Sequence, residues 1–411
     1  KTVVGFVILS QGGGIICTAL NSLGPAFESA FHVQGVIPAN EAVIGTAQEL
    51  FGSEMALIMA FGFLANILIA RFTKFKYIFL SGHHILFMAA LLTAILSVLN
   101  FSGVELIACG SLLLGIIMTL CPAMVQPFYR KVTGSDMVAM GHFNGVSYSL
   151  SSLVARVTGD KNKSTEDLNI PKRLNFLRDT TISTGLLMTV IYLITFAFSD
   201  PSVTLELSGG DNIYMFAIMQ AMIFTAGFVV VLQGVRMILA EIVPAFKGIS
   251  STIVPDAIPA LDVPILYTYA PNAVMVGFLA SLVGGMLSFI ALRFTDLPLI
   301  IPGLIPLFFV GAGVGVLANA QGGLRGTIIA GIFNGAFITF LPALMVPLLD
   351  SLGFMNATFS DADFAFYGIL IGNAGQNFGK IGVYALIVAG LIVFAIGSVL
   401  KTSKITKETQ E

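Results

Sequence analysis

The 411-residue sequence contains no tryptophan and three cysteines, and only 10% of its residues are charged. Soluble proteins contain roughly 25% charged residues, so this scarcity excludes an ordinary soluble domain. The cysteines, Cys17, Cys109 and Cys121, lie in apolar surroundings without metal-ligand spacing, which predicts buried free thiols. Phosphate loops, zinc motifs and nucleophile motifs are also missing from the sequence. We therefore expect no enzyme activity, cofactor, metal or nucleic-acid partner.

What the sequence does contain is hydrophobic residues, which make up 56% of the chain. They form runs of about 20 residues, the length that a helix needs to cross a membrane. The predicted fold class is an all-α polytopic membrane protein with about 10 crossing helices plus re-entrant half-helices. The expected crossings are 3–27, 55–70, 77–98, 105–127, 180–199, 214–235, 275–292, 297–318, 327–349 and 381–400.

The distribution of Lys and Arg predicts the orientation. If the first crossing runs outward, the loops 28–54, 200–213 and 350–363 lie outside, and they contain acidic residues without Lys or Arg. Of the 20 basic residues, only Arg293 and Lys380 then fall outside. The positive-inside rule therefore predicts a cytoplasmic C-terminus. Because the chain begins inside a hydrophobic run, we also expect the native protein to have a further N-terminal portion.

The chain contains a weak internal repeat. Its best match pairs residues 119–124 with 339–344, and Pro127 with Pro347. Five crossings separate the two starts, so the halves are predicted to be inverted repeats, an architecture typical of transporters. The stretches 134–155 and 364–376 are too polar or too short to cross and are predicted as re-entrant segments that line a cavity. The predicted parts are a first repeat (1–155), a cytoplasmic loop with a linking helix and outer loop (156–213), a second repeat (214–376) and a last helix with its tail (377–411).

Four ionisable residues at membrane depth are candidate substrate ligands, because such groups are costly there. His83 and His84 follow Gly82, and His142 follows Gly141. Asp262 lies in a stretch with three prolines in ten residues, which forbids a regular helix. The alternatives are a helix-packing role for the histidines and a capping role for Asp262.

Two further residues, Asn40 and Glu41, occupy the equivalent region of the first half. They either enter the site from the other side or face water. Asp256 is a weaker candidate in the proline-rich stretch.

The chain resembles the membrane IIC component of the L-ascorbate branch of the bacterial phosphoenolpyruvate-dependent phosphotransferase system. The resemblance covers nearly the whole chain and is carried by Gly82-His83, Gly141-His142, and the stretches 164–171, 233–237, 262–274 and 300–306. It implies a homodimer in the bacterial inner membrane that carries L-ascorbate inward. It also implies a cytoplasmic IIB phosphocarrier that phosphorylates the sugar from a phosphocysteine.

The resemblance places substrate contacts at Asn40, Glu41, His83, Phe87, His142, Phe143 and Asp262. The sequence departs from the family pattern at four of these positions. Asn40-Glu41 stand where the family often has Thr-Tyr, and Phe87 and Phe143 stand where it has Gln. These changes alter which sugar hydroxyls can be hydrogen-bonded, and each unpaired buried polar group costs about 1–3 kcal/mol. A related acidic or neutral sugar is therefore an alternative substrate.

Other functions remain possible from the residues alone. An ion-coupled secondary transporter of a small sugar or organic anion would use Asp262 or Glu241 as its coupling site, since a fold does not fix the energy source. A passive channel would show no saturable binding. The basic stretch from Arg156 to Arg178 either docks the partner protein or serves only as a positive-inside anchor.

Overall fold

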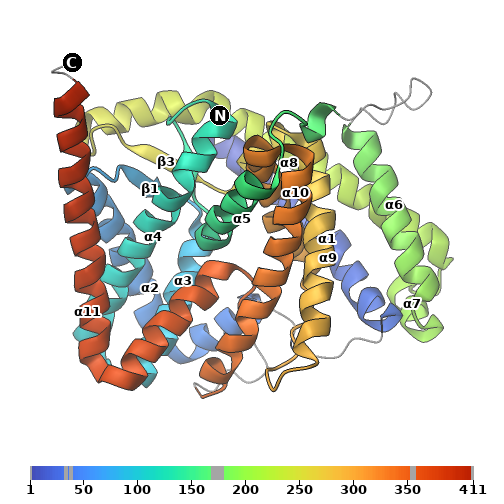
Figure 1. Cartoon of the computed structure of the whole chain (residues 1–411). Helices are drawn as coiled ribbons and strands as arrows, with labels where there is room; N and C mark the ends of the chain where they lie inside the picture. The colour runs from blue at the N-terminus through green and yellow to red at the C-terminus, as the bar shows by residue number, and fades with distance from the viewer. Residues whose placement is uncertain (1, 32–35, 37–39, 168–179, 352–357, 409–411) are drawn as a thin grey trace. The chain divides into compact units, whose positions relative to one another are not determined.

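The computed structural model describes residues 2–31, 36, 40–167, 180–351 and 358–408. Most of them are helical (Figure 1). The α-helices are α1 (Thr2–Ala30), α2 (Asn40–Phe72), α3 (Gly82–Val98), α4 (Gly103–Thr133), α5 (Gly145–Thr158), α6 (Thr180–Phe198), α7 (Pro201–Ser208), α8 (Ile213–Thr252), α9 (Pro271–Leu292), α10 (Leu304–Ser351) and α11 (Ala362–Glu408). The short 3-10 helices are η1 (Thr165–Asp167) and η3 (Val263–Thr268), and the strands are β1 (Tyr77–Phe79), β2 (Ala139–Met140) and β3 (Ile258–Leu261).

Six helices within the described residues are long and apolar enough to span a membrane. The six spans are Leu50–Phe72, Gly103–Thr133, Ile213–Gly234, Pro271–Leu292, Leu304–Leu349 and Ala362–Val399. Two shorter apolar helices, Gly82–Val98 and Thr184–Phe198, accompany them. The predicted polytopic, largely helical membrane protein is therefore confirmed.

The all-α prediction omitted a small β-sheet. Its order is β1-β3-β2, and both pairings are parallel, with Ile78 opposite Pro259 and Met140 opposite Leu261. The predicted crossing at 77–98 is helical from Gly82 to Val98, and the prediction is wrong for Tyr77–Phe79, which form a strand. The strands are two to four residues long, too short to show the alternating pattern by which strands are recognised in a sequence.

The chain folds as two compact units. The first contains residues Lys1–Val36, Ser151–Ile242 and Pro264–Thr339, and the second contains Ile37–Leu150, Val243–Val263 and Phe340–Glu411. All three strands belong to the second unit. Its core is formed by apolar residues of α2, α3, α4 and α11. Small residues bring α2 and α4 close together, since a Cβ atom at Gly115 would lie only 2.6 Å from that of Ala65.

In the first unit, α10 is broken at Gly322 and Gly323. Separate crossings were predicted at 297–318 and 327–349. They correspond to the two parts of α10 on either side of this break, although the helix begins later than predicted, at Leu304. Gly323 has φ of 58°, and a Cβ atom there would lie 2.3 Å from the carbonyl oxygens of Asp160 and Lys163. The loop after α5 therefore packs directly on the break. Asp160 N donates to Gly322 O at 2.8 Å, and Leu324 N donates to Lys163 O at 2.7 Å.

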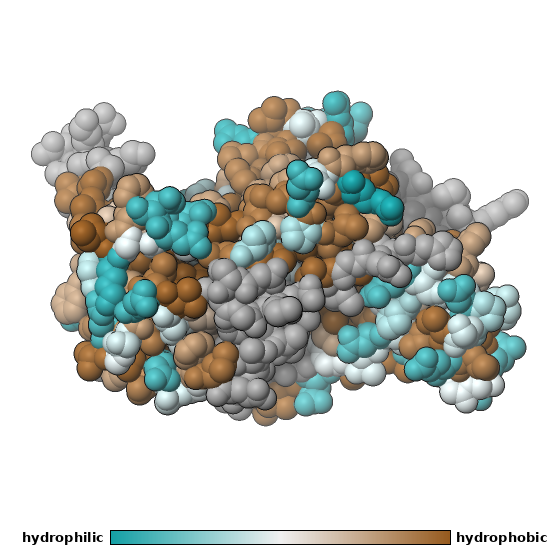
Figure 2. Space-filling view, turned by 90° about the horizontal axis from the view of Figure 1, so that it is seen from below, coloured by the Kyte–Doolittle hydropathy of each residue, from teal (hydrophilic) through white to brown (hydrophobic). Residues whose placement is uncertain are grey.

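Many large apolar side chains of the described residues reach the surface, and Figure 2 shows hydrophobic areas on one face. On α11, Val388, Ile392 and Ile396 recur every four residues and are 53%, 49% and 55% exposed. This spacing places them on one helix face. A helix face that is both apolar and uncovered matches the hydrocarbon of a membrane.

Candidate functional site

The small sheet of the second unit brings the predicted site residues together. His83 and His84 follow β1, His142 follows β2, and Asp262 follows β3. Because the three strands are parallel, their carboxyl ends meet at one edge of the sheet. Two backbone bonds extend the pairing into the loops: Leu80 N donates to Ala260 O at 3.0 Å, and Gly141 N to Leu261 O at 2.7 Å. The four ionisable residues therefore come from three distant segments and gather at this edge.

His142 lies at the centre of the cluster. Its Nδ1 is 2.7 Å from Asp262 Oδ1 and 2.9 Å from His84 Nε2, and its side chain is only 7% exposed. Since a carboxylate only accepts hydrogen bonds, Nδ1 carries the proton that is donated to Asp262. His142 Nε2 faces Asp361 Oδ1 at 3.5 Å. The imidazole is thus held between two carboxylates.

His83 and His84 present different faces of the same helix start. His83 has a side chain that is 53% exposed and lies 3.5 Å from Asp262 Oδ2, whereas His84 is buried. Within the described residues, His84 Nδ1 is buried and makes no hydrogen bond. This nitrogen is an open position for a ligand, because buried polar atoms are normally paired.

The start of α3 adds backbone donors to the site. Ser81 stands at the N-cap, but its hydroxyl donates to Gly141 O instead of capping the helix. The first-turn N–H groups of α3 are thereby left to other acceptors. Gly82 is exposed, and a Cβ atom there would meet nothing within 4 Å, so a ligand can approach this backbone closely. A helix N-terminus beside histidines favours an anionic group.

Reciprocal caps hold the loop that carries His142. Asp363 accepts from Gly145 N and Val146 N, both at 2.9 Å, and so caps α5. Asn144 Oδ1 accepts from Ala362 N at 2.9 Å at the start of α11. The two helix starts therefore fix each other, and His142 lies just before one of them.

Asn66 of α2 anchors the strand that leads to His83 and His84. Its side chain is fully buried, and its Nδ2 donates to Tyr77 O at 3.1 Å and to Thr119 Oγ1 at 2.9 Å. Its Oδ1 accepts from Phe79 N at 3.1 Å. The amide thus connects α2, α4 and β1.

The predicted aromatic contacts lie beside and beneath the histidines. Phe87 is half-buried on α3, with its ring 5.8 Å from that of His83. Phe143 is fully buried and stacks on Phe79 at 4.5 Å between ring centroids. The ring of Phe364 stacks near-parallel to that of His84 at 6.0 Å. Phe143 thus packs in the core next to the site, and its direct contact with a sugar stays a prediction.

Of four other candidates, the structure describes the side chain of Asp256 alone. Asn40 and Glu41 lie at the start of α2, and their side chains are outside the described part of the chain. The side chain of Glu241 is outside it as well. Asp256 is exposed in the turn before β3, with φ of 60°.

Sequence reasoning missed Asn66, Asp361 and Asp363 as parts of this region. Asp361 and Asp363 were expected in an outer loop, yet they are 4% and 0% exposed at the start of α11. Counting loop charges cannot distinguish buried from exposed carboxylates. The available signal was an Asp-x-Asp pair directly before an apolar run, which is typical of a helix start.

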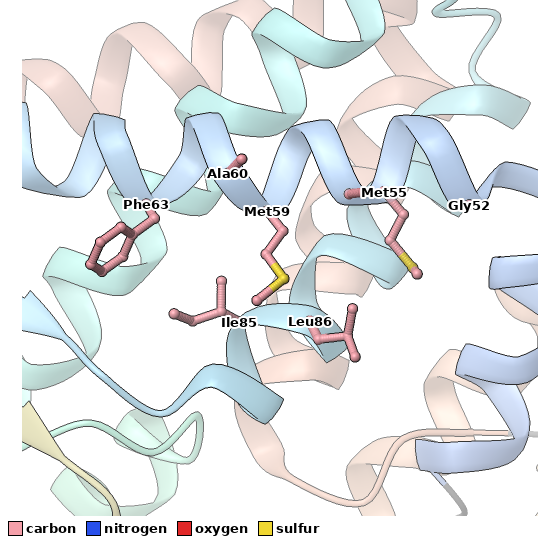
Figure 3. Close-up of a pocket in the computed structure, with 8 residues that line it drawn as sticks. Gly52, Met55, Met59, Ala60, Phe63, Ile85 and Leu86 are labelled. Carbon is pink, nitrogen blue, oxygen red and sulfur yellow. The ribbon is translucent and has the colours of Figure 1, made fainter. Parts of the chain in front are cut away.

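A separate pocket of about 520 Å³ lies between α2 and α3. Figure 3 shows Met55, Met59 and Phe63 of α2 on one side and Ile85 and Leu86 of α3 on the other. The remaining lining residues, Gly52, Ala56 and Ala60, are also apolar. Such a lining cannot satisfy sugar hydroxyls, so this pocket is distinct from the polar cluster.

Comparisons with known proteins agree with this geometry. A family model described as "PTS system sugar-specific permease component" matches residues 1–363. The ascorbate-specific PTS system EIIC component of Mycoplasma pneumoniae (strain ATCC 29342 / M129 / Subtype 1) is 25% identical over 385 residues. That alignment covers 80% of this chain and 58% of the relative, so the chain spans less than two thirds of that protein's length.

Proposed function

This chain belongs to the family of sugar-specific permease components of the phosphotransferase system (PTS), and we propose on that basis that it binds a sugar beside His83, His84, His142 and Asp262 and carries it inward across the membrane. The observation that carries the proposal is the meeting of three imidazoles and a carboxylate at one sheet edge. Together they offer N–H donors and carboxylate acceptors, the groups that sugar hydroxyls need.

We propose L-ascorbate as the sugar. The name of the Mycoplasma pneumoniae relative supports this choice. The chemistry of the site supports it too, because ascorbate is an enolate anion near neutral pH. The uncapped start of α3 and the neighbouring histidines suit such an anion. The Phe side chains at 87 and 143, where related proteins often have Gln, leave His83, His142 and Asp262 as the main polar contacts.

The proposed transport cycle requires a partner. A cytoplasmic IIB phosphocarrier would phosphorylate the sugar as it is released inside, so this chain itself performs no phosphoryl transfer. The basic stretch from Arg156 to Arg178 is the proposed docking segment on the cytoplasmic side. We further propose that the protein has about ten crossings arranged as two inverted repeats. It forms a homodimer in the bacterial inner membrane.

Substrate binding tests the site directly. His83→Ala, His142→Ala and Asp262→Ala should each abolish measurable ascorbate binding to the purified protein, because each removes a polar partner of the cluster. Asp256→Asn is the matched control, since Asp256 is exposed near β3 and outside the cluster. Size-exclusion profiles identify variants that no longer fold. Wild-type affinity in a folded variant would remove that residue from the site.

Uptake into membrane vesicles tests the energy source. With the PTS partner proteins and phosphoenolpyruvate present, the sugar should accumulate in phosphorylated form. Accumulation of unmodified ascorbate driven by an ion gradient, without partner proteins, would instead establish an ion-coupled secondary transporter. Uptake that does not saturate with ascorbate concentration would indicate a channel.

A further inference from the structure

We propose that the same cluster is a binding site for a divalent transition-metal ion such as Zn²⁺, with His83, His84 and Asp262 as its ligands. Each residue offers one ligand atom, and these atoms lie within 4.8 Å of one another. Two imidazoles and a carboxylate form a ligand set that zinc and related ions prefer. The three residues come from two segments, the start of α3 and the loop after β3, so the folded sheet assembles the site.

To hold a metal, ligand atoms that lie within 4.8 Å of one another must move closer together. With metal–ligand bonds of about 2.0–2.1 Å, ligand atoms of a tetrahedral site lie roughly 3.3 Å apart. His83 Nε2 and Asp262 Oδ2 are already 3.5 Å apart. His84 is buried; its Nε2 contacts His142 Nδ1 at 2.9 Å, and its Nδ1 makes no hydrogen bond within the described residues.

The surroundings supply the orientation and access that such a site needs. His142 Nδ1 donates to Asp262 Oδ1 at 2.7 Å, as does Val263 N, leaving Oδ2 directed toward His83. Hydrogen bonds of this kind orient metal-ligating carboxylates. The half-exposed side chain of His83 provides an entry path from solvent. With three protein ligands, a fourth position stays open for water or a ligand.

If the sugar binds where the proposed function places it, Zn²⁺ bound at the metal site should inhibit sugar binding. Zn²⁺ would engage His83, His84 and Asp262, which are the groups proposed to bind the sugar hydroxyls. The ion and ascorbate should therefore exclude each other. Mg²⁺ should not compete, because it prefers oxygen ligands in octahedral geometry.

Calorimetric titration of the full-length purified protein with Zn²⁺ alone tests the site without any sugar. Wild-type protein should bind one equivalent, and His83→Ala and Asp262→Asn should each bind about tenfold or more weakly, in the range found when metal-site partners are lost. Asp256→Asn should bind like the wild type. Co²⁺ in place of Zn²⁺ should give d–d absorption bands without the charge-transfer band of a thiolate, which separates this site from the three cysteines.

Several results would overturn the proposal: lack of one-equivalent Zn²⁺ binding by the wild type, unchanged affinity in folded His83→Ala and Asp262→Asn, or a thiolate band with Co²⁺. The competition experiment is read separately. If Zn²⁺ binds as expected and ascorbate binding is unaffected by it, the metal site stands and the proposed sugar location is wrong. If ascorbate binds to this cluster and Zn²⁺ does not, the sugar site stands alone.

Discussion

Single side chains in this protein connect segments that are far apart in sequence. His142 contacts His84 at the start of α3 and Asp262 in the loop after β3, and it faces Asp361, which directly precedes α11. Removing one buried carboxylate from this set leaves an N–H group without its acceptor. The cost is about 1–3 kcal/mol per unsatisfied group, so the cluster is sensitive to every member.

Variants of Phe143 distinguish a role in core packing from a direct contact with the sugar. Phe143→Ala should lower the free energy of unfolding by about 3–5 kcal/mol, because a fully buried ring leaves a cavity, and Phe143→Leu should cost less. Thermal unfolding in detergent measures both. Phe366→Leu is the control, since Phe366 is 39% exposed on α11. If Phe143→Leu kept its stability but lost ascorbate binding, the ring would be a direct sugar contact instead.

Lys380 explains one of the two exceptions to the predicted charge distribution. Its ammonium group pairs with Glu105 at the start of α4, and it lies 4.9 Å from the centre of the Phe101 ring. Glu105 also accepts a hydrogen bond from Tyr384. A lysine on the predicted outer side is thus matched by a local carboxylate, which a count of Lys and Arg alone does not reveal.

The sequence singled out the ionisable residues that the structure brings together, but not the residues that support them. His83, His84, His142 and Asp262 stand out because ionisable groups are rare in apolar runs. Asn66 does not stand out, since its importance comes from bonds to residues up to 53 positions away. Asp363 was assigned to a loop because a count of loop charges does not distinguish a carboxylate at a buried helix start from an exposed one.

At the scale of elements, Asn66 determines where β1 lies. Asn66→Ala should destabilise the second unit, because it removes the partners of Tyr77 O, Phe79 N and Thr119 Oγ1 at once. We expect a lower unfolding temperature together with weaker ascorbate binding, because β1 leads directly to His83 and His84. Asn373→Ala on the exposed side of α11 is the matched control. Unchanged stability and binding in Asn66→Ala would contradict the anchoring role.

The helices and the interruptions in them could be predicted from the sequence, whereas the strands could not. The proline-rich stretch around Asp262 correctly indicated a broken segment, and it contains β3 and η3. The break of α10 at Gly322 and Gly323 coincides with the polar gap predicted between two crossings. The sheet could not be predicted, because its pairings join residues more than a hundred positions apart.

For the whole molecule, the predicted orientation can be checked with engineered cysteines. Glu206→Cys on α7 should react with a membrane-impermeant thiol reagent in intact cells, because the positive-inside rule places this loop outside. Lys161→Cys should react only after the membrane is opened. Both positions are exposed, whereas Cys109 and Cys121 are buried. Cys17 is partly exposed, contrary to the prediction that all three thiols are buried, so both variants are made in a Cys17→Ser background. The reverse pattern of labelling would invert the topology.

The order of the sheet also governs when His83, His84, His142 and Asp262 can gather during synthesis. The central strand, β3, is made roughly 120 residues after β2, which takes roughly 6–24 s at about 5–20 residues per second. Until then β1 and β2 have no strand between them, and His83 at the start of α3 and His142 after β2 cannot meet Asp262. A ribosome that stalls before residue 258 therefore leaves a chain in which these side chains cannot gather, however well its first helices have folded.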